Sequence, residues 1–383
     1  MHHKKQEEII MSTSFIIHKA SDVITENAST REMSGDNAFL FHKSLSHYQP
    51  TPCLQLKALA EKSGVGEIYV KDESKRFGLN AFKGLGAVYA IHQVLKKNPD
   101  ITTFCTATDG NHGKAVAWGA SLFGKKSVVY VPEDTTTHRM KAIEAEGAIV
   151  EKVNGDYDFA CAHAEKNSIR NKWQLVQDMA WEGYEEIPSW IMAGYMTLFR
   201  EMENDIHILP EPLPDIVFMQ AGVGSFAASG VYYYLKRYGK KRPAIVVVEP
   251  LQADAIFSSL KEGKLTTSKG NARTIMAGLN CGTPSTTAWD IIKNGIDVSL
   301  KVPDSYAAQA MRLLYYPGGD DPRIISGESG AAGLVGFLAI MHEKKLEPVK
   351  DFLKLNASTR ILFINTEGDT DKDVFQKIIS ARN

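Results

Sequence analysis

The sequence predicts an α/β protein built on parallel β-sheets, and three observations carry that prediction. Short runs rich in β-branched and apolar residues recur along the 383 residues. Segments with the apolar period of a helix lie between most of these runs. The runs also lack a regular alternation of polar and apolar residues, which indicates strands that are buried on both faces. Strand, helix and strand in repetition are typical of a doubly wound parallel sheet.

The elements are expected in a regular order along the chain. The clearest strands are expected at 67–71, 102–106, 127–131, 148–152, 215–220, 244–249 and 360–365. Helices are expected between them, at 84–97, 113–123, 138–146, 226–237 and 330–342. Parallel sheets of this kind bind ligands at the carboxyl ends of their strands, so we expect the functional residues in loops that directly follow strands.

The composition excludes several functions. Apolar residues make up 44% and charged residues 23% of the chain, which is usual for a globular protein. The net charge of -1 gives no basic excess for a nucleic-acid partner. The four cysteines form no Cys-x-x-Cys motif, so we expect neither a metal site nor a disulfide framework. No apolar run could span a bilayer and no signal-peptide core is present, so we expect a cytoplasmic protein without a membrane partner.

Two glycine-containing loops directly follow predicted strands. The first, at 107–113, has the sequence Ala-Thr-Asp-Gly-Asn-His-Gly and precedes a helix. The second, at 220–225, has the sequence Gln-Ala-Gly-Val-Gly-Ser and also precedes a helix. The successive backbone N–H groups of the second loop and the positive end of the following helix are suited to bind a phosphate.

The second loop leaves a nucleotide-binding alternative open. Gly222, Gly224 and Ala227 satisfy the pattern G-x-G-x-x-A of dinucleotide-binding folds. Glu249 ends the next predicted strand, where an acid that binds a ribose would lie. On these residues alone, an NAD enzyme and an enzyme with another phosphate-bearing ligand are both candidates.

Lys83 favours the second of these alternatives, an enzyme with another phosphate-bearing ligand. It stands at the start of a predicted helix, directly after Phe82, in the segment Asn-Ala-Phe-Lys-Gly at 80–84. A helix N-terminus and apolar neighbours disfavour an ammonium group, so we expect a lowered pKa for Lys83. A lysine of this kind is suited to form a covalent bond with a carbonyl group.

The order of these parts resembles the fold-type II family of pyridoxal-phosphate (PLP) enzymes, which includes the tryptophan synthase β-subunit and threonine dehydratase. The resemblance runs from about residue 44 to about residue 377. It implies that the cofactor is PLP, that Lys83 holds it covalently and that Asn111 bonds its phenolic oxygen. It also implies a phosphate site that is formed by Gly222, Val223, Gly224 and Ser225.

The family resemblance further predicts the architecture. Residues 1–84 and 201–383 would form a larger PLP-binding domain, and residues 85–200 a smaller α/β domain, each with a mainly parallel sheet flanked by helices. The cofactor would lie in the cleft between them, with the segment 365–368 opposite its pyridine nitrogen. Thr366 is the first candidate for that contact, and Asn365 is its rival. A homodimer is implied by the resemblance alone.

Longer strings narrow the resemblance to the diaminopropionate ammonia-lyases, a group within this family. These strings lie at 71–74, 77–83, 108–113, 176–178, 180–184, 274–279, 326–330 and 366–371. They imply an amino-acid substrate and a PLP-dependent α,β-elimination that converts both D- and L-2,3-diaminopropionate to pyruvate and ammonia.

The same resemblance implies roles for three catalytic residues. Lys83 would accept the α-proton of the L substrate, and Asp109 that of the D substrate. Asp178 would pair with the distal ammonium of the substrate through a charge-assisted hydrogen bond, which contributes about 1.5–3 kcal/mol. Asn280 departs from the form expected in these lyases and leaves the substrate preference open.

Two other functions stay open at this point. A serine/threonine dehydratase or another β-eliminating enzyme would share the fold, although those dehydratases usually carry a small residue in place of Asp109. A catalytically silent ligand-binding or regulatory protein would also share the fold, although an intact Lys83 argues against it.

Overall fold

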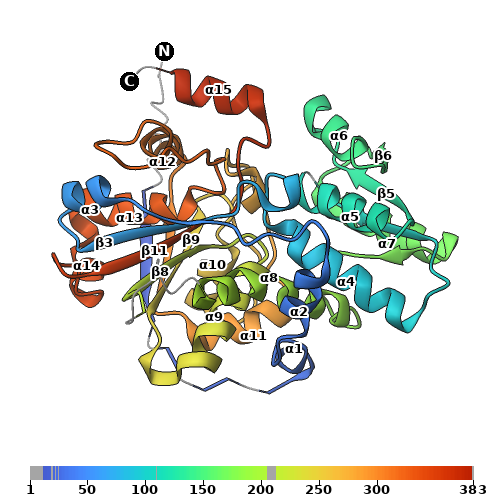
Figure 1. Ribbon diagram of the computed structural model, residues 1–383, viewed down its shortest axis with the longest axis horizontal. Helices are drawn as coiled ribbons and strands as arrows, with labels where there is room; N and C mark the ends of the chain where they lie inside the picture. Colours follow the sequence, from blue (N-terminus) through green and yellow to red (C-terminus); the bar gives the residue numbers. More distant parts are fainter. Residues whose placement is uncertain are drawn as a thin grey trace, which may run out of the picture.

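The computed structural model describes residues 12–381, apart from residues 19, 22, 25, 109 and 205–212. Within these residues the chain forms two α/β bodies that lie side by side (Figure 1). The sheet of the larger body has seven strands, in the order β1 (Ser14–Ile17), β10 (Val298–Val302), β9 (Ala244–Pro250), β8 (Ile216–Gln220), β11 (Arg360–Asn365), β3 (Glu67–Asp72) and β2 (Cys53–Gln55). The sheet of the smaller body has four, in the order β6 (Ile149–Lys152), β5 (Lys126–Val131), β4 (Thr103–Ala107) and β7 (Gln174–Leu175).

Both sheets are mainly parallel. In the larger sheet only the edge strands β1 and β2 run antiparallel to their neighbours, and the smaller sheet is parallel throughout. The predicted fold class is therefore confirmed. All seven strands expected from the sequence are present, and none of their ends is shifted by more than one residue. The clearest strands of the sequence pattern do not include β1, β2, β7 and β10.

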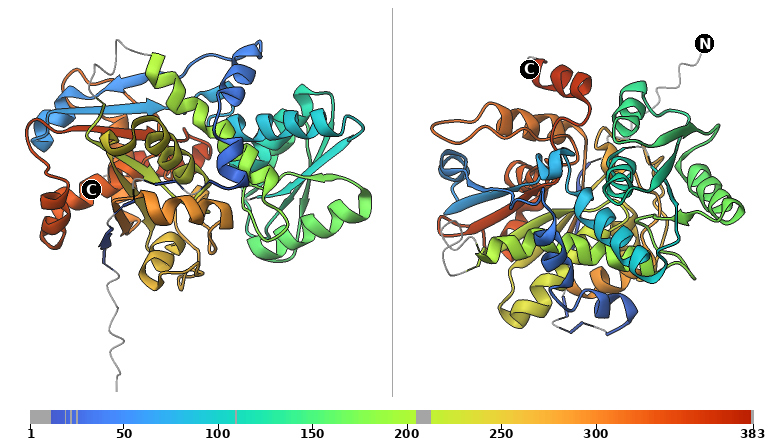
Figure 2. Two further views of the ribbon diagram at one scale, coloured as in Figure 1. Left: turned by 90° about the horizontal axis from the view of Figure 1, so that it is seen from below. Right: turned by 45° about the vertical axis from the view of Figure 1, so that its right-hand side comes forward.

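Helices cover both faces of each sheet (Figures 1 and 2). The α-helices are α1 (Ala28–Glu32), α2 (Asn37–Ser44), α3 (Lys57–Ser63), α4 (Lys83–Lys97), α5 (Asn111–Leu122), α6 (Thr137–Glu144), α7 (Tyr157–Asn171), α8 (Glu186–Asn204), α9 (Ser225–Tyr238), α10 (Ala255–Glu262), α11 (Thr286–Gly295), α12 (Ser305–Tyr315), α13 (Ala332–His342), α14 (Glu347–Phe352) and α15 (Lys372–Ser380). Four short 3-10 turns complete the described elements, η1 (Arg76–Gly78), η2 (Gly239–Lys241), η3 (Ala277–Leu279) and η4 (Lys344–Leu346). Among the described residues, none of these helices combines the length and apolarity that crossing a membrane requires.

The central strands show why polar alternation is missing from the sequence. In β8, Ile216 and Phe218 join the apolar cluster that contains α13, whereas Val217 and Met219 join the cluster that contains α4, α8 and α9. Every residue of β8 is buried. A strand covered by helices on both faces needs apolar residues at successive positions, as the sequence has them.

Helices α4 and α8 lie at the junction of the two bodies. They pack against each other, and α8 also packs against α9 of the larger body. Lys83 is the first residue of α4, and α5 begins at Asn111, directly after the carboxyl end of β4. The junction thereby brings residues from both bodies to one pocket.

Candidate active site

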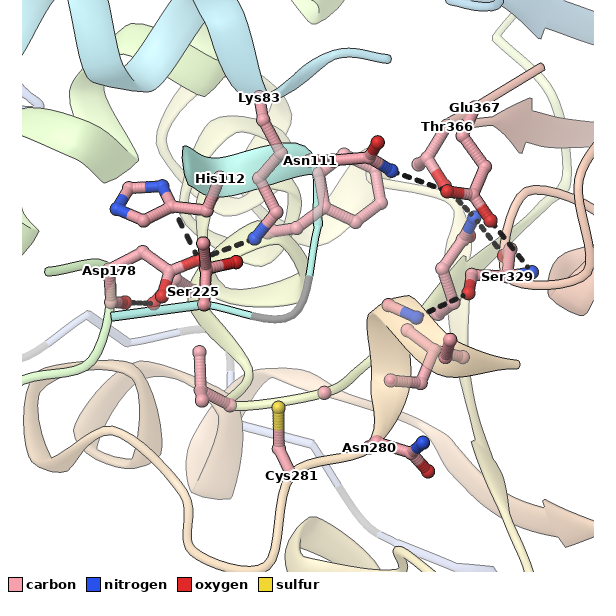
Figure 3. A pocket seen from close by; sticks show the side chains of 18 of the residues that line it. Lys83, Asn111, His112, Asp178, Ser225, Asn280, Cys281, Ser329, Thr366 and Glu367 are labelled. Carbon is pink, nitrogen blue, oxygen red and sulfur yellow. Dashed lines mark hydrogen bonds and ion pairs between the residues drawn. The ribbon is translucent and has the colours of Figure 1, made fainter. Parts of the chain in front are cut away.

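The loops at the carboxyl ends of β4 and β8 line a pocket between the two bodies (Figure 3). Phe82, Tyr157 and Cys281 contribute to its wall as well. The pocket is also lined by the predicted site residues Lys83, Asn111, Asp178, Gly222, Val223, Gly224, Ser225 and Thr366. Asp109 lies outside the described residues, so its predicted role stays a prediction.

Lys83 is paired with Asp178 across the pocket. Its Nζ donates a hydrogen bond of 2.5 Å to Asp178 Oδ2, and both side chains are largely buried, at 18% and 8% exposed (Figure 3). Burial alone would lower the pKa of Lys83, but the charge of Asp178 outweighs burial and raises that pKa above its ordinary value. The prediction of a lowered pKa is therefore wrong for this state of the site, because it left out a carboxylate far along the chain.

Asp178 is held in place from several sides. Burial would raise the pKa of its carboxyl, but the charge of Lys83 outweighs burial and lowers the pKa to about 2. The Ser225 hydroxyl donates to the Asp178 backbone carbonyl at 2.7 Å and so joins the loop after β7 to the loop after β8. Asp178 is consequently an anion that is aimed into the pocket.

His112 is fixed as a neutral ring beside this pair. Burial is the main cause that lowers its pKa. The ring nitrogen Nε2 lies 2.8 Å from the Val176 carbonyl oxygen, which only accepts, so Nε2 carries the proton. The other nitrogen, Nδ1, has no hydrogen-bond partner among the described residues and lies 3.9 Å from Asp178 Oδ2. This arrangement agrees with a packing role for His112.

The loop from Gly222 to Ser225 forms an anion-binding cup at the start of α9. Gly224 has a φ of 93°, a conformation that favours glycine, and a Cβ there would come within 3.0 Å of Ile292. Among the described residues, the backbone N–H groups of this loop make no hydrogen bond. They are available, with the positive helix end, for a phosphate. Because the Ser225 hydroxyl is already used, its backbone N–H is the donor it can offer.

Thr366 and Asn365, the two candidates for the contact with the pyridine nitrogen, differ in where their side chains lie. The Asn365 side chain donates to Asp72 at 2.8 Å and does not line the pocket, whereas Thr366 does. Gln220 Nε2 donates to the Thr366 hydroxyl oxygen at 2.7 Å. The same Nε2 faces the carbonyl oxygen of Ile364 at 3.1 Å, which fixes the orientation of the amide. The Thr366 hydroxyl therefore accepts from Gln220 and keeps its own proton for an acceptor in the pocket.

Asn280 lines the pocket, but its polar atoms are used within its own loop. Its Oδ1 accepts from the Thr274 N–H at 2.9 Å, and its Nδ2 donates to the Thr274 carbonyl at 3.3 Å. Asn280 therefore affects a ligand through the conformation of this loop and not through a hydrogen bond of its own.

The nucleotide-binding alternative fails at Glu249. This side chain is completely buried and accepts hydrogen bonds from the backbone N–H groups of Ile256 and Phe257, at 2.8 and 2.7 Å. It binds the N-terminus of α10 and cannot reach a ribose. No group of three or more His, Cys, Asp or Glu side chains in the described part of the chain is placed to hold a metal ion.

Glu328 gives the site region a pH-dependent stability. Burial is the main cause that raises its pKa to about 7, and the charge of Glu367 adds to it. A carboxyl with a raised folded-state pKa stabilises the folded chain below its unfolded pKa, and this contribution is lost as the pH rises through about 7. We expect the free energy of unfolding, measured with urea, to fall by up to about 2–3 kcal/mol between pH 5 and pH 8. Glu328→Gln should flatten this dependence, and an equally steep curve in that variant would contradict the assignment.

The fold and the pocket define an α/β enzyme of two bodies, with a buried lysine and an anion cup facing each other between them. Comparison with known proteins agrees, since the family model described as pyridoxal-phosphate dependent enzyme matches residues 45–356. The chain therefore belongs to this family of PLP enzymes. The described residues fit PLP, because the pocket offers a lysine, free N–H groups for a phosphate and a hydroxyl donor.

Individual relatives are closely similar over nearly the whole chain. The diaminopropionate ammonia-lyase of Salmonella typhimurium is 40% identical over 369 residues, which cover 90% of this chain and 91% of that protein. A crystal structure of the diaminopropionate ammonia lyase from Escherichia coli, in complex with an aminoacrylate-PLP azomethine reaction intermediate, superposes with a TM-score of 0.88. It is 37% identical, with 96% of this chain and 97% of that chain covered. A threonine deaminase from Solanum lycopersicum is 20% identical with a TM-score of 0.77, which shows the fold alone.

Proposed function

We propose that this chain is a PLP-dependent lyase that eliminates ammonia from 2,3-diaminopropionate and yields pyruvate and ammonia. The buried pair of Lys83 and Asp178 beside the anion cup is the observation that carries the proposal. It puts a group that binds an ammonium next to a lysine that can hold the cofactor. The 40% identity to the lyase of Salmonella typhimurium supports the same substrate.

Four parts of the pocket would hold PLP. Lys83 would hold it covalently, the N–H groups of Gly222–Ser225 would bind its phosphate, Asn111 would donate to its phenolic oxygen and Thr366 would donate to its pyridine nitrogen. When bound, PLP withdraws electrons from the substrate α-carbon and so makes the α-proton removable. A hydroxyl donor at the ring nitrogen keeps that nitrogen unprotonated, which favours elimination over transamination.

The contact between Lys83 and Asp178 suggests how the substrate activates its own base. While Lys83 holds PLP it is no longer a free ammonium at Asp178, so the distal ammonium of the substrate can take that place, one cation for another. Lys83 then loses the charge that raised its pKa, and burial lowers that pKa, as expected for a proton acceptor. Asp178, paired with the cation of the substrate instead, stays ionised and keeps the leaving amine protonated.

Both enantiomers of the substrate require a base on each side of the α-carbon. We propose that Lys83 serves the L enantiomer and Asp109 the D enantiomer, as the family resemblance implies. Asp109→Asn is then expected to reduce turnover of the D enantiomer by about 10²–10⁴-fold and to leave turnover of the L enantiomer near that of the unsubstituted enzyme. Pyruvate release from each enantiomer measures both rates in one preparation. Equal losses for the two enantiomers would contradict this division of roles.

Three further proposals rest on the family resemblance. The two bodies would be domains divided near residues 84 and 200, the chain would work as a homodimer, and it would act in the cytoplasm. Light scattering coupled to gel filtration tests the homodimer, because a monomeric mass for the active enzyme would contradict it.

A further inference from the structure

The sequence pattern does not single out Glu367, yet its carboxylate meets two parts of the pocket. Oε2 accepts a hydrogen bond of 2.5 Å from Asn111 Nδ2, and Oε1 accepts one of 3.1 Å from the backbone N–H of Ser329 (Figure 3). Glu367 lines the pocket and is only 6% exposed. A buried carboxylate with both oxygens bonded is held in one orientation.

The backbone of Glu367 is fixed to the segment that places Lys83. Ala81 and Glu367 form an isolated antiparallel bridge. The Phe82 N–H donates to the Thr366 carbonyl at 3.0 Å, directly beside this bridge. The carboxylate of Glu367 therefore has a fixed position relative to Lys83, and it extends from there across the junction to the first residue of α5.

The bond to Glu367 decides which end of the Asn111 amide faces each neighbour. An ionised carboxylate only accepts hydrogen bonds, so it takes the NH2 end of the amide. One N–H of Asn111 is used by Glu367, and the second is left to donate to an anionic acceptor in the pocket. With the amide reversed, the carbonyl oxygen of Asn111 would face that acceptor and repel it.

We propose that Glu367 is a positioning residue that acts through Asn111 and keeps an amide N–H directed at the phenolic oxygen of bound PLP. The inference rests on the proposed contact between Asn111 and that oxygen.

The test measures binding and absorbance of the cofactor, without substrate. PLP is removed from the purified enzyme and titrated back while the visible absorbance band is recorded. Glu367→Gln can bond Ser329 only with its carbonyl oxygen, which turns its NH2 group toward Asn111 and reverses the Asn111 amide. We expect about five- to tenfold weaker PLP binding and a displaced band for this variant. Asp369→Asn is the matched control, because Asp369 lies in the same loop and accepts instead from Asn80, at 3.4 Å.

A double-mutant cycle separates positioning from a general structural effect. In an Asn111→Ala background, Glu367→Gln should add little to the loss of PLP affinity, because its route to the cofactor is gone. Additive losses, or an unchanged band in Glu367→Gln, would overturn the inference. If Asn111→Ala itself leaves the band and the affinity unchanged, the proposed Asn111 contact fails, and this inference fails with it.

A second variant covers the case in which Glu367→Gln does not fold. Glu367→Asp keeps the charge but is shorter by one methylene, so it cannot span Asn111 and Ser329 together. It should displace the band in the same direction, and a band identical to that of the unsubstituted enzyme would again overturn the inference.

Discussion

Lys83→Ala is expected to reduce turnover of 2,3-diaminopropionate by about 10³-fold or more, because it removes the covalent attachment of PLP and a base in one step. The visible absorbance band of the lysine-bound cofactor should be lost as well. Asp178 then keeps a buried negative charge without its ammonium partner, so its pKa should rise from about 2. Pyruvate release and the absorbance spectrum of the purified variant check both parts of the prediction.

Lys114→Ala is the control for this variant. Lys114 lies on α5, is partly buried and donates to the Leu79 carbonyl at 3.2 Å, in the cavity next to the pocket. Its removal should leave the absorbance band in place. Circular dichroism shows whether both variants are folded. A folded Lys83→Ala protein that keeps its band and its turnover would refute the role of Lys83 and the proposed reaction with it.

The parts of the molecule that are encoded locally could be predicted from the sequence. The strand Ile216–Gln220 and the loop after it are one continuous segment, and a parallel sheet places such loops at one edge. The predicted phosphate loop therefore lies in the pocket. The short edge strands β1 and β2 could not be predicted in this way, since three or four residues carry too little pattern.

Contacts between distant segments explain what the sequence could not predict. The expected pKa of Lys83 was wrong because Asp178, its partner, comes 95 residues later in the chain. The same limit applies to Glu367, whose bond to Asn111 crosses 256 residues. Glu249 fitted a ribose-binding pattern, but a helix N-terminus takes its carboxylate. The position of a polar group along the chain does not determine its partner, and the partner determines what the group can do.

A buried ionic network that includes Arg76 gives the largest expected effect of a substitution on stability. The Arg76 guanidinium donates to Glu73 at 2.7 and 2.8 Å and to Glu201 at 2.8 and 2.7 Å. Lys71 also donates to Glu201, at 2.7 Å, and none of the four side chains is more than 1% exposed. Glu201 lies on α8, so the network joins β3 and the turn after it to the helix at the junction.

Arg76→Met is expected to lower the free energy of unfolding by about 3–5 kcal/mol, because it leaves the buried Glu73 without its cation and Glu201 with Lys71 alone. That is a large part of the total stability of an ordinary domain, about 5–15 kcal/mol. Urea unfolding measures the change. Arg237→Met is the matched control, since Arg237 pairs with Glu203 but is 56% exposed, and its loss should cost less than about 1 kcal/mol. Similar losses in the two variants would contradict the importance of the network.

At low pH, the free energies of unfolding of Arg76→Met and of the unsubstituted protein should differ less than at neutral pH. Burial would raise the pKa of Glu201, but the charge of Arg76, followed by that of Lys71, lowers it from 4.5 to about 2. A carboxyl with a lowered folded-state pKa stabilises the protein above its unfolded pKa, and that contribution is lost as the pH falls through about 2. Below pH 4.5 the unsubstituted protein therefore loses a stabilisation of which the variant keeps only the smaller part, from Lys71. Urea unfolding from pH 7 to pH 3 measures this difference in the free energy of unfolding. A difference that stays constant over this range would show that Arg76 stabilises the fold by packing and not by its charge.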